Sequence, residues 1–373
     1  MIKAMTNEKK HILPFFDEAS AALAKKLPSI SFLKDSVREL SIDVCTLSRV
    51  YDPNERFRFL HECAVIEFKG TLYASWYNNP ETELHGYTPI SEMRSRDGGK
   101  TWSEMTTVVH DEEGKILYCP PVYGIDEGRL YMFVNQMVGA DLIHALDLYV
   151  LNEESDRFER IWSRPLPCKM NTNVVRLSNG KLLLPCRLAA LDGFPRTPAV
   201  LISDSGKIDA EWRVVKIAEN GVMPDGSELL HPELSVIEEA GVLYMFCRDD
   251  ERCVPLVYLS YDLGETWSAA HGHDIPAVSS KIYTGKLKDG QNYLIANIDD
   301  YSRRRLAIYF SQKGSVAFDR RIVIDGEKDG ISFTRLHYPC AFETNGRLLI
   351  IASVDYEGKG RGSAMISVDL SKI

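Results

Sequence analysis

The chain has 373 residues, of which 45% are hydrophobic and 26% are charged, proportions typical of a folded globular protein. Its formal net charge of −9 disfavours nucleic acid and anionic membrane as partners. The eight cysteines are scattered without a C-x-x-C pair, which argues against a zinc or disulfide framework and favours a reducing compartment.

Residues 1–40 are predicted to form a helical prefix. Within it, residues 13–27 read as one amphipathic helix with Asp17 as its cap, packed against the main body. The N-terminus lacks the apolar run of a signal peptide, and no later stretch is apolar enough to span a membrane. We therefore expect a cytoplasmic protein with no membrane partner.

The chain beyond residue 40 is dominated by a repeat. Six copies of a hairpin pattern, each with a turn glycine, follow one another at nearly even spacing along the chain. The turn glycines are Gly70, Gly128, Gly180, Gly241, Gly290 and Gly346. This spacing predicts an all-β fold over residues 41–373, a six-bladed β-propeller of four-stranded antiparallel blades. The segment Ser41–Cys45 is expected to supply the outer strand that closes the last blade beside residues 364–370.

A second motif recurs on the same period. Residues 95–102 and 260–267 both fit S-x-D-x-G-x-T-W, and their aspartates, Asp97 and Asp262, are separated by three repeats of the hairpin pattern. Weaker copies occupy residues 203–212 and 311–318. The aspartate is expected to accept backbone N–H groups in a hairpin turn and the glycine to adopt a left-handed conformation. These Asp boxes are interpreted as structural rather than catalytic.

The repeat also predicts where a site would lie. Polar residues begin the innermost strand of several blades and end the next strand, and both positions share one edge of an antiparallel hairpin. One mouth of the channel should therefore carry His61, Asn171, His231, Lys281, His337, Gln136, Arg187 and Arg248. Arginines are suited to bidentate carboxylate binding, so this mouth predicts an anionic ligand. For each arginine, pairing with a neighbouring acid, such as Asp299 or Asp300, is the alternative.

Two Asp boxes on a six-fold repeat resemble the sialidase (neuraminidase) superfamily. The resemblance covers roughly residues 50–373 and implies an exo-glycosidase that removes a carboxylate-bearing terminal sugar. It implies Tyr338 as the nucleophile, Glu233 as the carboxylate that activates it, and Arg248 as a carboxylate ligand. Arg305 fits the next arginine best among Arg303, Arg304 and Arg305, and Arg187 is a further candidate. No metal or other cofactor is implied.

The sequence departs from the sialidase pattern at two positions. His61 stands where the first blade of a sialidase carries an arginine, and the loop that should offer an acid/base aspartate offers Glu81, Glu83 and His85, of which Glu83 is the preferred candidate. A second hypothesis is therefore a glycosidase or lyase for uronic-acid-containing oligosaccharides with His61 as acid/base. A third is a non-catalytic glycan-binding propeller. The oligomeric state is left open.

Overall fold

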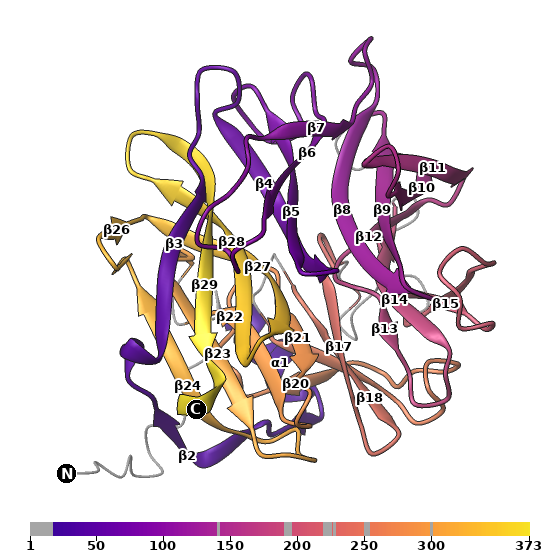
Figure 1. Cartoon of the computed structure of the whole chain (residues 1–373). Helices are drawn as coiled ribbons and strands as arrows, with labels where there is room; N and C mark the ends of the chain where they lie inside the picture. Colours follow the sequence, from indigo (N-terminus) through magenta and orange to yellow (C-terminus); the bar gives the residue numbers. More distant parts are fainter. Residues whose placement is uncertain are drawn as a thin grey trace.

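The computed structural model of the protein describes residues 18–139, 142–189, 196–218, 226, 229–249, 254–298 and 301–373. Six sheets of four or five, mainly antiparallel, strands are arranged around a common centre, and each follows the next in chain order (Figure 1). The predicted six-bladed propeller is therefore confirmed.

Each blade begins with its innermost strand. Blade one consists of β4 (Phe59–Phe68), β5 (Thr71–Asn79), β6 (Ile90–Ser95) and β7 (Thr106–Val109). Blade two consists of β8 (Leu117–Asp126), β9 (Arg129–Met137), β10 (Ile143–Asn152) and β11 (Arg157–Arg164). Blade three consists of β12 (Cys168–Met170) with β13 (Val175–Arg176), β14 (Leu182–Leu188), β15 (Thr197–Ser203) and β16 (Arg213–Lys216).

The other three blades take additional strands from the N-terminal part of the chain. Blade four consists of β17 (Leu234–Glu239), β18 (Val242–Cys247), β19 (Leu256–Ser260), β20 (His271–His273) and β1 (Ser29–Ile30). Blade five consists of β21 (Tyr283–Lys286), β22 (Asn292–Asn297), β23 (Arg305–Ser311), β24 (Phe318–Asp325) and β2 (Leu33–Glu39). Blade six consists of β27 (Arg335–Thr344), β28 (Arg347–Tyr356), β29 (Gly360–Asp369) and β3 (Cys45–Tyr51). A small hairpin of β25 (Glu327–Lys328) and β26 (Ile331–Ser332) precedes the last blade.

The six predicted turn glycines all adopt positive φ angles, from 71° at Gly346 to 92° at Gly290. In the first blade the preceding residue, Lys69, is also left-handed at 49°. Two successive residues with positive φ form the tight turn whose twist matches that of a β-hairpin. The glycine repeat therefore marks the joint between the first two strands of each blade.

The Asp boxes form the hairpin turns predicted for them. Asp97 accepts the backbone N–H groups of Lys100 and Thr101 at 3.0 and 2.9 Å, and Asp262 accepts that of Thr266 at 2.9 Å. The box glycine Gly264 has a φ of 95°. These bonds hold the link between the third and fourth strands of a blade, away from the inner strands that line the channel.

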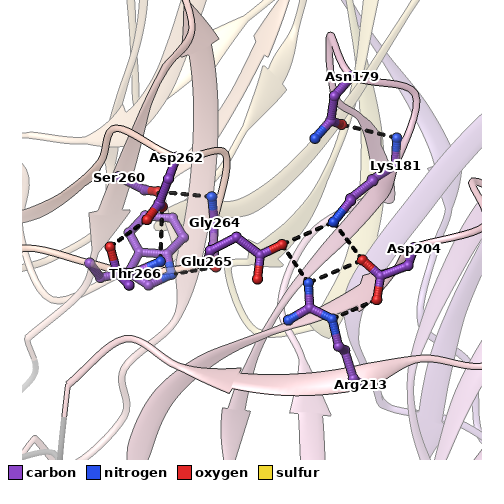
Figure 2. A network of polar contacts seen from close by, with 10 residues as sticks. Asn179, Lys181, Asp204, Arg213, Ser260, Asp262, Gly264, Glu265 and Thr266 are labelled. Carbon is purple, nitrogen blue, oxygen red and sulfur yellow. Dashed lines mark hydrogen bonds and ion pairs between the residues drawn. The ribbon is translucent and has the colours of Figure 1, made fainter.

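The second Asp box also ties its blade to the preceding one (Figure 2). Glu265, inside the box, contacts Lys181 at 3.0 Å and Arg213 at 2.6 Å, both on the third blade. Asp204 contacts the same two cations, each at 2.6 Å. Two acids and two bases thus alternate in one exposed network between blades three and four.

The N-terminal segment lies along the outer edges of the propeller. The described part of helix α1 spans Glu18–Lys26, and residues 13–17 of the predicted helix, with the predicted cap Asp17, lie outside the described residues. β1 and β2 then pair in parallel with β20 and β24, an addition that the sequence did not predict. Asp274 fixes this segment by accepting the backbone N–H of Phe32 at 2.8 Å.

The last blade is closed by a strand from the N-terminal side of the propeller, as predicted. Figure 1 shows β3 beside the C-terminal strand β29, and the two pair from Cys45↔Val368 to Tyr51↔Ser363. The closing strand begins at Cys45 rather than ending there, because a short 3-10 turn, η2 (Ile42–Val44), precedes it. A second such turn, η4 (Leu370–Lys372), follows β29.

The remaining sequence expectations concern cysteines and membrane segments. The seven described cysteines are all buried, no disulfide joins any two of them, and Cys253 lies outside the described residues. Within the described ranges, no helix has both the length and the apolar character needed to cross a membrane.

Candidate active site

The centre of the channel is shaped by bulges in the innermost strands. The strand pairing shifts between His337 and Cys340 in the last blade and between His61 and Ala64 in the first. Each bulge contains a left-handed residue that is not glycine: Tyr338 with a φ of 54° and Glu62 with a φ of 49°. Such a bulge redirects a side chain, and here it places a phenol and a carboxylate in equivalent positions of neighbouring blades.

Tyr338 shares an arginine with a glutamate. One nitrogen of Arg248, Nη1, donates to the Tyr338 hydroxyl oxygen and to Glu233 Oε2, both at 2.5 Å. Tyr338 is 7% exposed and Glu233 is 4% exposed. Burial raises the pKa of Tyr338, and the positive charge of Arg248 opposes that rise. The phenol is thus held beside a carboxylate, as the sialidase resemblance implied.

Two buried histidines surround the same phenol. The ring centroid of His61 lies 4.0 Å from that of Tyr338, and the ring of His337 lies 5.5 Å away. His61 Nδ1 is 2.9 Å from the hydroxyl of Ser353, and His337 Nε2 is 3.7 Å from Asp355. Burial lowers the pKa of His61 well below its usual value and that of His337 to about 3, so both rings are neutral near pH 7.

Glu62, which the sequence analysis did not select, is the centre of a second ionic cluster. Its carboxylate contacts Lys169 Nζ at 2.8 Å and Lys281 Nζ at 3.3 Å, and all three side chains are buried. Burial alone would raise the pKa of Glu62, but the two lysines lower it to about 2. Its position eight residues before the turn glycine, shared with Glu233 and Tyr338, was the signal that could have found it.

Cations lie around the Tyr338 ring on several sides. The charged groups of Arg248, Lys281 and Arg303 are 5.8, 5.7 and 5.6 Å from its centroid. Arg303 rather than Arg305 is the fifth-blade arginine at this ring, because Arg305 begins β23 and forms an ion pair with Asp325 at 3.6 Å. The Arg303 guanidinium also lies 3.5 Å from His337 Nδ1.

The other residues predicted for this mouth have different surroundings. Glu83 accepts a hydrogen bond from the Tyr77 hydroxyl at 3.0 Å, and the Tyr77 ring lies 6.1 Å from that of His61. Gln136 instead donates to Asp147 within the second blade at 2.7 Å. His231 is half-buried, and its carbonyl accepts the Glu233 N–H at 2.8 Å.

Blade three contributes a further pair of predicted residues. Arg187 is buried and pairs in register with Lys169 across the strands β14 and β12. Asn171 is 1% exposed and follows Lys169 by two residues. The acids Asp250, Asp299 and Asp300 lie outside the described residues.

The cluster is a set of cations and carboxylates around one phenol. In the part of the chain that the structure describes, no group of three or more His, Cys, Asp and Glu side chains is arranged to hold a metal ion. The predicted residues that meet at Tyr338 are Glu233, Arg248, His61, His337 and Lys281.

Fold and site together define a six-bladed propeller with a buried cationic centre at its channel. The model of the BNR repeat-like domain family matches residues 70–351, more than half of the chain. The protein belongs to this family. No curated protein sequence matches the chain at a significant level.

Solved structures share the fold at low sequence identity. A protein of unknown function from Dyadobacter fermentans is 16% identical with a TM-score of 0.66, and the alignment covers 86% of this chain and 98% of that one. Trypanosoma rangeli sialidase is 14% identical with a TM-score of 0.62, and the alignment covers 87% of this chain and 59% of that one. That structure is a complex with 2,3-difluorosialic acid, described as a covalent intermediate. The NanB sialidase of Streptococcus pneumoniae is 12% identical with a TM-score of 0.65, over 87% and 70%. This chain thus spans 59% of the length of the trypanosomal enzyme.

Proposed function

We propose that the protein is an exo-glycosidase that removes a terminal sugar bearing a carboxylate, of sialic-acid type, from a glycan. The observation that carries this proposal is the shared guanidinium: Arg248 Nη1 binds both the Tyr338 hydroxyl and Glu233, each at 2.5 Å. A phenol is a poor nucleophile at neutral pH unless a base accepts its proton. Here the carboxylate that would accept it is held on the same nitrogen.

The proposed reaction is a double displacement. The Tyr338 oxygen attacks the anomeric carbon and its proton passes to Glu233, while the glycosidic bond breaks and the leaving oxygen takes a proton from Glu83. Water then attacks the anomeric carbon and gives one proton to Glu83, while the Tyr338 oxygen leaves and takes its proton back from Glu233. Arg248 and Arg303 would bind the sugar carboxylate, because their guanidiniums lie 5.8 and 5.6 Å from the centroid of the Tyr338 ring. The covalent intermediate of the trypanosomal sialidase supports this route by analogy.

A second candidate uses His61 as the acid/base on a uronic-acid-linked sugar. Its support is the position of the His61 ring, 4.0 Å from Tyr338 in the blade where a sialidase carries an arginine. Burial lowers its pKa, so the ring is neutral near pH 7, the protonation state that a general base requires.

Kinetics of two variants separate these candidates. We expect Tyr338→Phe to abolish hydrolysis of 4-methylumbelliferyl N-acetylneuraminide, whereas the exposed control Tyr261→Phe should retain it. If 4-methylumbelliferyl glucuronide is the substrate instead, His61→Ala should abolish turnover and Tyr338→Phe should largely spare it. Wild-type protein that hydrolyses neither class of glycoside contradicts the enzymatic proposal and favours a glycan-binding propeller.

A further inference from the structure

The ionic cluster around Glu62 is not used by either proposed reaction. Lys169 and Lys281 come from blades three and five, and both ammonium groups contact the single carboxylate of Glu62 from blade one. The three side chains belong to residues that are 6%, 6% and 2% exposed. Two buried positive charges on one negative charge leave a surplus, and buried charge is costly unless it is compensated.

The side-chain amide of Asn171, beside this cluster, is a second buried polar group that lacks compensation. Asn171 is 1% exposed, and neither its side-chain oxygen nor its nitrogen has a hydrogen-bond partner among the residues described. Asn171 directly follows β12, and its backbone N–H donates to the Pro185 carbonyl at 3.1 Å, which continues the pairing with β14. Lys169 lies two residues earlier, so the two side chains project from one face. A buried amide without partners costs about 1–3 kcal/mol, and a bound ligand would remove that cost.

The cluster lies beside the proposed reaction centre. Lys281 Nζ is 3.3 Å from Glu62 and 5.7 Å from the centroid of the Tyr338 ring, so it links the two groups of residues. The charge of Glu62 compensates one lysine when no ligand is present, and its left-handed backbone at 49° directs the carboxylate to that point. The donors that remain are two ammoniums and one amide.

We propose that Lys169, Lys281 and Asn171 form a second oxyanion subsite, which takes a sulfate or carboxylate substituent of the same ligand. The inference rests on the proposed function and extends it: the preferred sugar carries a second anionic group besides the carboxylate bound by Arg248 and Arg303. Ammonium groups bind such oxygens through charge-assisted hydrogen bonds, and the Asn171 amide adds a neutral donor.

Inorganic sulfate is the probe for this subsite. Calorimetric titration of the full chain with sodium sulfate, with chloride adjusted to constant ionic strength, should give saturable binding. Lys281→Met and Lys169→Met should each weaken it at least tenfold, while Lys115→Met, a lysine whose side chain is 76% exposed, should leave it unchanged. A parallel titration with acetate shows whether the subsite prefers sulfate or carboxylate oxygens.

Competition in the wild-type protein tests the same proposal without variants. If there are two subsites, N-acetylneuraminate should bind with the same affinity in the presence of saturating sulfate. The second subsite is ruled out if sulfate and N-acetylneuraminate displace each other, or if sulfate shows no saturable binding. It is also ruled out if the folded Lys281→Met protein binds sulfate with unchanged affinity. Failure of the glycosidase proposal gives a different result from failure of the second subsite. In that case the protein neither binds N-acetylneuraminate nor turns over a sialoside, while its sulfate binding still depends on Lys281.

Discussion

At the scale of single residues, the geometry of Tyr338 is the least expected feature of the molecule. A bulky aromatic with a φ of 54° is strained by about 1–3 kcal/mol, so the surrounding contacts must hold it in place. Those contacts are the Arg248 hydrogen bond and the His61 ring. Glu62 has the same backbone conformation, so the inner strands of blades one and six redirect a buried side chain in the same way.

The two fifth-blade arginines should differ in their effect on substrate binding. Arg303 lies over the Tyr338 ring, whereas Arg305 pairs with Asp325. Arg303→Ala should raise KM by about 10- to 100-fold, the scale of a lost charge-assisted hydrogen bond. Arg305→Ala is the matched control and should change KM by less than about threefold. Equal effects of the two variants would contradict the assignment of Arg303.

Part of this site could be predicted from the sequence because the repeat phase aligns positions in different blades. His61, Glu233, Arg248 and Tyr338 meet although they belong to the first, fourth and last blades. Glu62 was missed because a bulge inserts a residue into the alternation, and a strict two-residue period cannot show which side it faces.

At the scale of elements, the two intact Asp boxes provide a matched pair. Their glycines Gly99 and Gly264 are equivalent, with φ angles of 87° and 95°. A Cβ on Gly264 would meet Leu183 at 3.2 Å, closer than the 3.6 Å to Leu72 at Gly99.

Alanine at either position adopts an unfavourable backbone, and only Gly264→Ala also crowds the core of the neighbouring blade. Gly99→Ala should therefore cost about 1 kcal/mol of unfolding free energy, and Gly264→Ala about 1–3 kcal/mol more. Urea denaturation followed by tryptophan fluorescence measures both. A smaller loss at Gly264 than at Gly99 would show that the packing against Leu183 is not tight.

Removing the Asp262 carboxylate should affect stability and leave catalysis unchanged. The carboxylate holds the turn through the backbone and hydroxyl of Thr266 and lies on the outer part of the blade. Asp262→Ala should lower the melting temperature by about 2 °C, with kcat and KM of the surviving folded protein unchanged. A stable variant without activity would reveal a catalytic role for the box.

The N-terminal strands show what local sequence could not predict. β1 has only two residues, and β2 is mostly exposed. They pair with strands of the fourth and fifth blades, far along the chain, as in Ser29↔Gly272 and Leu33↔Phe318. No short-range periodicity specifies such a partner, whereas the hairpins of the blades are local and were predicted by their glycines.

At the scale of the whole molecule, three buried histidines make stability depend on pH. Burial lowers the pKa of His61 well below its usual value, and lowers those of His273 and His337 to about 3. The unfolded chain therefore binds more protons than the folded protein below about pH 6.5. Stability is full above that pH and falls as pH decreases toward 3.

Each histidine contributes at most about 1.4 kcal/mol per pH unit in this window. Urea unfolding at pH 7.5, 6.5 and 5.5 should show a decreasing free energy of unfolding, with the larger decrease between 6.5 and 5.5. His273→Leu is distant from the proposed site and should reduce that slope. A flat profile between 6.5 and 5.5 would mean that these imidazoles gain protons without unfolding.

The closure of the last blade has a consequence for biosynthesis. β3 is made early but pairs with β29, the last strand of the chain, and His61 and Tyr338 lie on the two blades that this pairing brings together. A nascent chain on the ribosome can form blades one to five in order, but it cannot complete the ring until β29 has emerged. The phenol and its neighbouring histidine therefore meet only after β29 has been made, so a chain that stops before β29 lacks the complete candidate site.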